Sequence, residues 1–76
     1  MIREHDTVVL SHDIKNQDLK AGDVGAVVHT YESGKAFEVE FITAVGETIA
    51  LLTLRDKDIR PMGNSEILHV RDFATI

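Results

Sequence analysis

The sequence has no cysteine and no tryptophan, and it contains a single proline and a single tyrosine. Without cysteine the chain can form no disulfide and no thiolate metal site, which fits a reducing compartment. The charged start Met1–Asp6 precedes an apolar-leaning run of only four residues, Thr7–Leu10. That run is too short for a secretory signal or a membrane-spanning helix, so we expect a cytoplasmic protein.

The chain has 76 residues, enough for one domain and too few for two. A domain of this size buries only about 60–65% of the surface of its unfolded chain, so its core is thin. Small domains often depend on a disulfide, a bound metal or a partner protein for stability. The thin core therefore supports the expectation of association with a partner.

The charge balance is acidic. Thirteen Asp and Glu residues against eight Lys and Arg residues give a net charge of −5, and the basic residues form no run. Nucleic-acid binding depends on basic residues that neutralise phosphates and release counterions, so this balance disfavours a nucleic-acid ligand.

The pattern along the chain predicts strands separated by glycine turns. Phe37, Val39 and Phe41 alternate with Glu38 and Glu40, which is typical of a strand with one buried and one wet face. Expected strands cover Thr7–Leu10, Val24–Tyr31, Ala36–Phe41 and Glu47–Leu54, with a last one starting at Arg60-Pro61. The expected structural turn residues are Gly22, Gly25, Gly34 and Gly46.

Two further elements are expected near the C-terminus. Asp56–Ile59 has the composition of a single 3₁₀ turn before the last strand. Residues 66–73 can form a strand, or a short helix with Asn64 or Ser65 as its N-cap. The β-branched residues Ile67 and Val70 favour the strand.

The turn at Lys20–Val27 resembles the glycine turn of KOW and translation-protein SH3-like domains. Further blocks in the same order are similar to a family of small bacterial proteins known as a domain of unknown function: Val8–Leu10, Leu19–Gly25, Glu38–Phe41, Gly46–Leu51, Thr53-Leu54 and Ile59–Pro61. The resemblance implies an all-β, five-stranded SH3-like barrel over residues 1–61, with no assigned activity and sometimes encoded among mobile or defence-type genes. Residues 62–76 exceed the usual end of that domain, and we expect them to form a C-terminal extension of it.

The hairpin between the third and fourth strands decides which side chains face outward. If it closes with a four-residue loop at Thr43–Gly46, directly opposed residues share a face. Phe41–Thr48, Val39–Ala50 and Phe37–Leu52 are then inner pairs, and Glu40–Ile49 and Glu38–Leu51 are outer pairs. The alternative is a one-residue bulge that turns Ile49 and Leu51 inward.

In the four-residue-loop register, Ile49 and Leu51 would be exposed to solvent beside the carboxylates of Glu38 and Glu40. Exposed aliphatic side chains of this kind predict a surface that another segment or protein covers. The cover can be the C-terminal segment through Ile67, Leu68, Val70 and Phe73, a second copy of the chain, or another protein. The expected partner-binding residues are Glu38, Glu40, Ile49, Leu51, Leu68, Val70 and Phe73.

Nothing in the sequence favours catalysis or a cofactor. Glu38 and Glu40 could act as acid and base only in a pocket, and a barrel this small fills its interior with side chains. The histidines His5, His12, His29 and His69 lack metal-ligand spacing, so we expect no metal and no catalytic residue.

The sequence therefore predicts a non-enzymatic protein-interaction module that forms a homo-oligomer or binds an unidentified protein. The alternative is a KOW-like domain that binds nucleic acid or the ribosome, suggested by the Lys20–Val27 turn. A small hydrolase is the weakest of the three classes.

Overall fold

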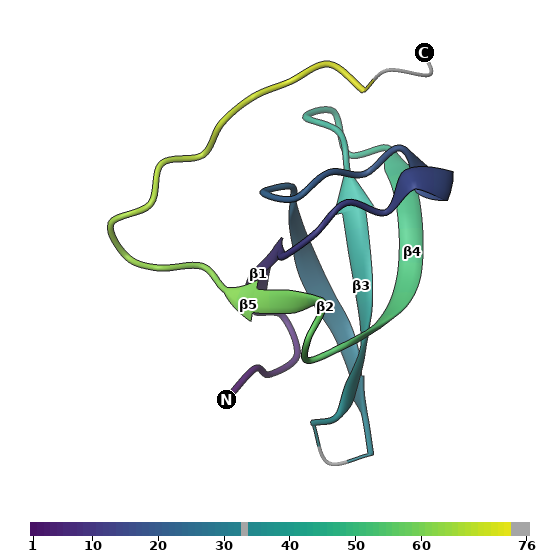
Figure 1. The fold of residues 1–76 in the computed structure, drawn as a ribbon, viewed down its shortest axis with the longest axis vertical. Helices are drawn as coiled ribbons and strands as arrows, with labels where there is room; N and C mark the ends of the chain where they lie inside the picture. The colour runs from purple at the N-terminus through teal and green to yellow at the C-terminus, as the bar shows by residue number, and fades with distance from the viewer. Residues whose placement is uncertain (33, 74–76) are drawn as a thin grey trace.

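The chain folds into one antiparallel sheet of five strands in the order β4-β3-β2-β1-β5. Figure 1 shows it as a computed structural model, described over residues 1–32 and 34–73. Its elements are β1 (Thr7–Leu10), the 3₁₀ helix η1 (Lys15–Gln17), β2 (Val24–Tyr31), β3 (Ala36–Ile42), β4 (Thr48–Arg55) and β5 (Ile59–Pro61). The all-β fold class is confirmed.

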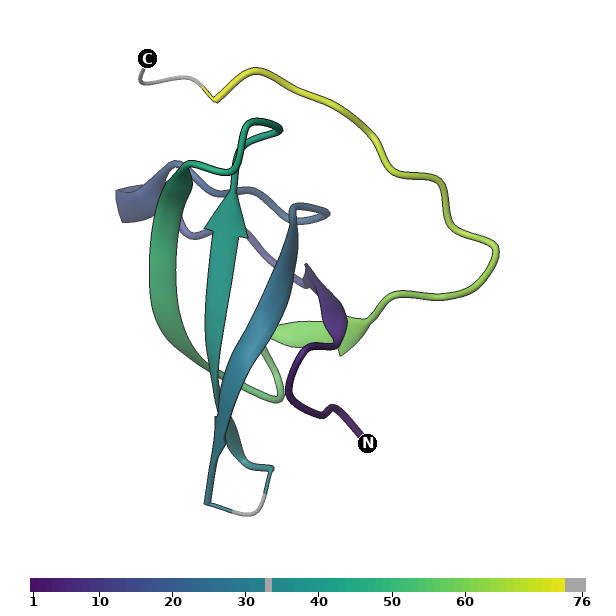
Figure 2. The same cartoon turned by 180° about the vertical axis from the view of Figure 1, so that it is seen from behind.

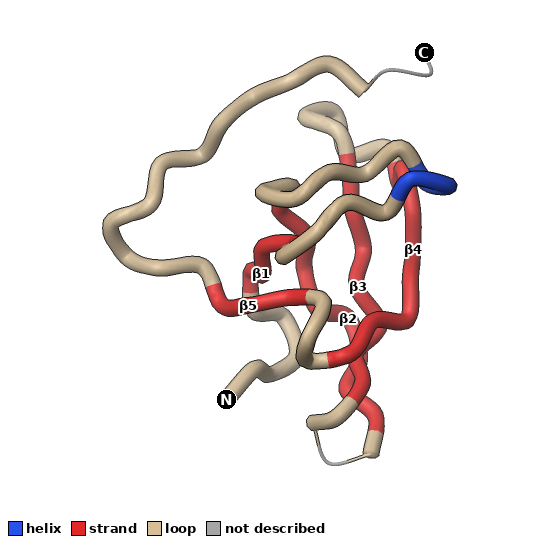
Figure 3. Tube along the Cα trace, viewed as in Figure 1, coloured by secondary structure: helices blue, strands red, loops and turns tan. Residues whose placement is uncertain are grey.

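The loops gather at the two ends of the strands. Strands β2, β3 and β4 run side by side, and β5 lies across the direction of β4 (Figures 1 and 2). The connection between β1 and β2, with η1, lies at the same end as the β3–β4 loop, and the β2–β3 turn lies at the opposite end (Figure 3). The β1–β2 connection and the β3–β4 loop therefore form one shared rim.

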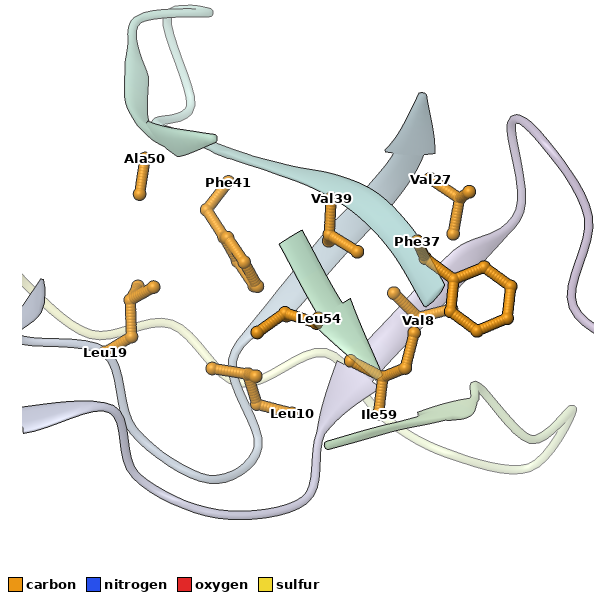
Figure 4. Packing of buried hydrophobic residues seen from close by; sticks show 10 residues of the cluster. All are labelled: Val8, Leu10, Leu19, Val27, Phe37, Val39, Phe41, Ala50, Leu54 and Ile59. Carbon is orange, nitrogen blue, oxygen red and sulfur yellow. The ribbon is translucent and has the colours of Figure 1, made fainter. Parts of the chain in front are cut away.

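The core is aliphatic and aromatic, and every strand contributes to it. Phe37, Val39 and Phe41 of β3 are buried and alternate with the more exposed Glu38 and Glu40, as the sequence pattern predicts. Figure 4 shows the cluster, which comprises Val8, Leu10, Leu19, Val27, Phe37, Val39, Phe41, Ala50, Leu54 and Ile59.

Gly25 of β2 faces β3 with no room for a side chain. A Cβ atom at this position would lie 2.8 Å from Phe41 Cε1 and 2.8 Å from Val39 Cγ1, so only glycine lets β2 pass β3 here. Gly22 has φ +94°, a backbone conformation that other residues rarely adopt. The other two expected turn glycines also have positive φ, +90° at Gly34 and +87° at Gly46.

The predicted β3–β4 register is wrong by two residues over most of its length. Thr43 N–H donates to Glu47 O at 2.8 Å, so the loop holds three residues between these two positions, not four. Phe37 pairs with Leu54, Val39 with Leu52, Phe41 with Ala50, Glu40 with Leu51, and Glu38 with Thr53.

A bulge accounts for the remainder of the shift. Ile42 pairs with Thr48 and Phe41 with Ala50, which leaves Ile49 as the extra residue. Ile49 is half-buried and packs against the core, whereas Leu51 stays on the outer face with Glu40. The expected outward position of Ile49 is therefore corrected, and the bulge alternative holds for Ile49 but not for Leu51.

Of two expectations for the C-terminal part, one is met and one is corrected. Asp58 N–H donates to Arg55 O at 2.9 Å, which closes the single turn expected before the last strand, and β5 begins at Ile59, one residue before the expected Arg60. Residues 66–73 form neither strand nor helix. A strand needs a neighbouring backbone, and the part of this segment that is described is held by side chains instead.

Candidate interaction surfaces

The structure divides the expected partner-binding residues between two places. Glu38, Glu40 and Leu51 share the outer face of β3 and β4. Ile49, Leu68, Val70 and Phe73 line a cavity at the rim, beneath the C-terminal segment. We call the first surface the outer face and residues 66–73 the tail.

Hydroxyl groups hold the two carboxylates of the outer face. Thr53 Oγ1 donates to Glu38 Oε1 at 2.7 Å, and Thr48 Oγ1 donates to Glu40 Oε2 at 2.6 Å. Both bonds cross between the paired strands, so they fix the side-chain directions over the sheet. The donors are neutral, and the outer face therefore keeps the negative charge of both glutamates.

Tyr31 and His29 extend the outer face onto β2. The Tyr31 hydroxyl donates to Glu38 Oε1 at 3.4 Å, and the two rings meet edge to face with centroids 4.6 Å apart. Partial burial and the charge of the neighbouring Glu38 raise the pKa of Tyr31 above 10.0. His29 Nδ1 lies 3.3 Å from Glu4 Oε2, which ties the N-terminal segment to this edge of the face.

Leu51 is the exposed apolar centre of the outer face, with 53% of its surface accessible. It lies on β4, which pairs only with β3 among the described residues. The other edge of β4 pairs with no strand among the described residues, but its Arg55 end is engaged, because Arg55 N–H donates to Asp58 Oδ2 at 2.8 Å and Asp58 N–H donates to Arg55 O at 2.9 Å.

The tail arches over the second surface. The chain leaves β5 after Pro61, and the tail then returns to the rim near the β3–β4 loop (Figures 1 and 2). Between the tail and the body lies a cavity of about 470 Å³, lined by apolar groups that include Phe41 and Ile49 on the body side. Phe73 is half-buried and packs against the core, whereas Leu68 and Val70 remain exposed.

An ion pair fixes the end of the tail. Arg71 Nε donates to Asp23 Oδ1 at 2.9 Å, Nη2 donates to Oδ2, and Nη2 also donates to Asp18 O at 3.1 Å. Partial burial raises the pKa of Asp23, but the hydrogen bonds from Arg71 and the Lys20 backbone outweigh it and leave the pKa below 3.8. The guanidinium thus faces a carboxylate that stays ionised at neutral pH.

A second ion pair fixes the start of the tail. Arg60 Nη1 and Nη2 donate to the two oxygens of Glu66 at 2.8 and 2.6 Å, and Gly63 N–H donates to Glu66 Oε1 at 2.6 Å. These donors lower the pKa of Glu66 to about 2. The four residues Ile67–Val70 between the two fixed points are all exposed.

His12 and Asp58 join the rim to the turn before β5. His12 Nε2 lies 2.7 Å from Asp58 Oδ1, and Nδ1 lies 3.0 Å from Asp13 O. The Asp58 hydrogen bond raises the pKa of His12 above 6.5. Burial opposes ionisation of Asp58, yet its hydrogen bonds from His12 and the Arg55 backbone lower its pKa.

The two carboxylates of the outer face are not enclosed. Glu38 and Glu40 lie on an open strand face and not in an enclosed pocket. Within residues 1–32 and 34–73, no group of three His, Cys, Asp or Glu side chains is placed to hold a metal ion. No helix in the same ranges is long and apolar enough to cross a membrane.

Several residues of these surfaces carry no clear signal in the sequence. Asp23 lies in the glycine turn and Arg71 in the tail, and only the fold brings them together. Thr48 and Thr53 could be placed on the outer face only with the correct hairpin register, because their partners are set by that register.

One comparison with known proteins gave a match. Residues 4–61 match the family model described as Domain of unknown function (DUF4926), which spans β1 to β5 and stops before the tail. No curated protein and no solved structure matches the sequence significantly.

Proposed function

The chain belongs to the DUF4926 family, and we propose that it is a non-enzymatic protein-interaction module that self-associates through the outer face and the open edge of β4. The observation that carries the proposal is Leu51, which is 53% exposed at the middle of β4, a strand whose other edge pairs with no strand among the described residues. An exposed aliphatic group beside such an edge favours association with another strand.

The ends of β4 are complementary in charge. Glu47 precedes the strand, and Arg55 ends it. When two copies of β4 pair antiparallel, the Arg55 end of one lies beside the Glu47 end of the other, so a cation meets a carboxylate at both ends of the contact. Leu51 of each copy then lies near the middle of the joint surface.

Within this proposal we keep the SH3-like barrel as the architecture and the cytoplasm as the location. The strand order, in which the last strand pairs with the first, supports the barrel. A KOW-like nucleic-acid function has less support, because Arg60 and Arg71 are engaged by Glu66 and Asp23 and the net charge is −5.

Light scattering over a range of protein concentrations tests self-association. We expect the mass of the wild-type protein to rise from one copy to two, and we expect Leu51→Asp to stay at one copy because the carboxylate would be desolvated in the contact. Val45→Asp is the matched control, since Val45 is exposed in the β3–β4 loop away from Leu51. A wild-type protein that remains a single copy throughout, or a Leu51→Asp variant that still doubles, contradicts the proposal.

A further inference from the structure

We infer that the rim between the Lys20–Val24 turn and the β3–β4 loop is a docking site for an extended peptide of a partner protein, in which an arginine is followed two residues later by an aromatic side chain. The site differs from the outer face and does not depend on self-association. The tail, with Arg71 and Phe73, is the intramolecular occupant that shows which chemistry fits.

The arginine half of the site is built from acidic and carbonyl oxygens. Asp23 binds Arg71 through both carboxylate oxygens, and Asp18 offers its backbone carbonyl. The carboxylate of Asp13 accepts from Ala21 N–H at 2.8 Å and adds negative charge to the same rim. A planar guanidinium matches this two-oxygen geometry better than an ammonium group does.

The aromatic half of the site is apolar. Phe73 packs against the buried core, and the adjoining cavity is lined on the body side by side chains that include Leu19, Phe41 and Ile49. A cavity of about 470 Å³ lies between the described part of the tail and the body, so residues 66–73 span this site without filling it. A partner segment with larger apolar groups can occupy the remaining volume.

The tail is attached in a way that allows it to be displaced. Ile67 and Val70 are 90% and 89% exposed, so the stretch between the two fixed points buries little surface. The Arg60–Glu66 pair holds the start of the tail outside the rim. Among the described tail residues, Arg71 and Phe73 make the main contacts that oppose displacement, together with the high local concentration of a tethered segment, on the order of millimolar.

Fluorescence anisotropy with a labelled peptide tests the inference on the full chain. The probe has the sequence of residues 66–73 with blocked ends, and a second probe carries glutamate in place of the arginine. We expect the first probe to bind the Arg71→Glu protein at least about tenfold more tightly than the wild-type protein, because the intramolecular competitor is removed. We also expect the glutamate probe to bind Arg71→Glu at least about tenfold more weakly than the first probe does.

A charge exchange provides the matched control. The Asp23→Arg protein should prefer the glutamate probe, which reverses the order seen with Arg71→Glu. Equal binding of both probes to Arg71→Glu, or no gain over the wild-type protein, overturns the inference. If Arg71→Glu does not fold, Arg71→Gln removes the charge with a smaller change, and the same comparisons decide. A wild-type protein that never self-associates leaves these results unaffected, so the two proposals fail separately.

Discussion

Arg71 and Asp23 lie 48 positions apart in the sequence, and two hydrogen bonds between their side chains fix the end of the tail to the rim. Arg71→Ala should release the tail and lower the free energy of unfolding by roughly 1 kcal/mol, since the pair is partly solvated. Backbone order parameters of Ile67–Phe73 should fall below about 0.6. Lys35→Ala, at an exposed cation outside the tail and outside β4, is the control and should leave these values unchanged.

Gly25→Ala should destabilise the protein by about 1–3 kcal/mol, because the new methyl group would overlap Phe41 and Val39 at 2.8 Å. Urea unfolding measures the change. Ala26→Ser, one residue further along β2 and exposed, adds an atom without this overlap. If Gly25→Ala had the same free energy of unfolding as Ala26→Ser, the claim that a side chain at Gly25 would overlap β3 would be contradicted.

Asp58→Asn should lower the pKa of His12 towards 6.5, because the hydrogen bond from Asp58 is the main cause of its elevation. An NMR titration of the His12 ring measures this shift, and Asp56→Asn is the control at a nearby carboxylate. A His12 curve that is identical in wild type and Asp58→Asn would contradict the contact.

The same pair predicts how stability depends on pH. The raised pKa of His12 contributes stability that is complete below 6.5 and is lost as the pH rises through the folded-state value. The lowered pKa of Asp58 contributes stability that is present above 3.8 and is lost as the pH falls through its folded-state value. The stability difference between wild type and Asp58→Asn should therefore be largest between these limits, and urea unfolding across the pH range measures it.

Glu38→Gln should lower the pKa of Tyr31 towards 10.0, since the substitution removes the carboxylate charge beside the phenol. Tyr31 is the only tyrosine and there is no tryptophan, so the absorbance of the phenolate reports on this residue alone. Glu40→Gln is the matched control on the same strand. An equal effect of both substitutions would indicate that Tyr31 does not contact Glu38 specifically.

The sequence predicts the strands well because their signals are local. β1 and β2 begin and end at the predicted residues, and the alternation of Phe37 to Phe41 correctly assigns the buried face of β3. The hairpin register is harder to predict. A change of one residue in the loop before Glu47 shifts every β3–β4 pair by one position, and the bulge at Ile49 shifts the pairs beyond it by one more position.

The tail shows a different limit of sequence reasoning. Its apolar residues Ile67 and Val70 suggest a strand, but the described tail is held by Arg71 and Glu66 through side chains. Such long-range ion pairs leave no periodic pattern. The division of the candidate residues into two surfaces therefore follows only from the fold.

Intermolecular nuclear Overhauser effects at Leu51 test the central claim most directly. In a mixture of isotope-labelled and unlabelled wild-type protein at millimolar concentration, we predict effects between the methyl groups of Leu51 and protons of a second copy. If Leu51 shows contacts only within its own chain while exposed to water, the proposed self-association through β4 is wrong.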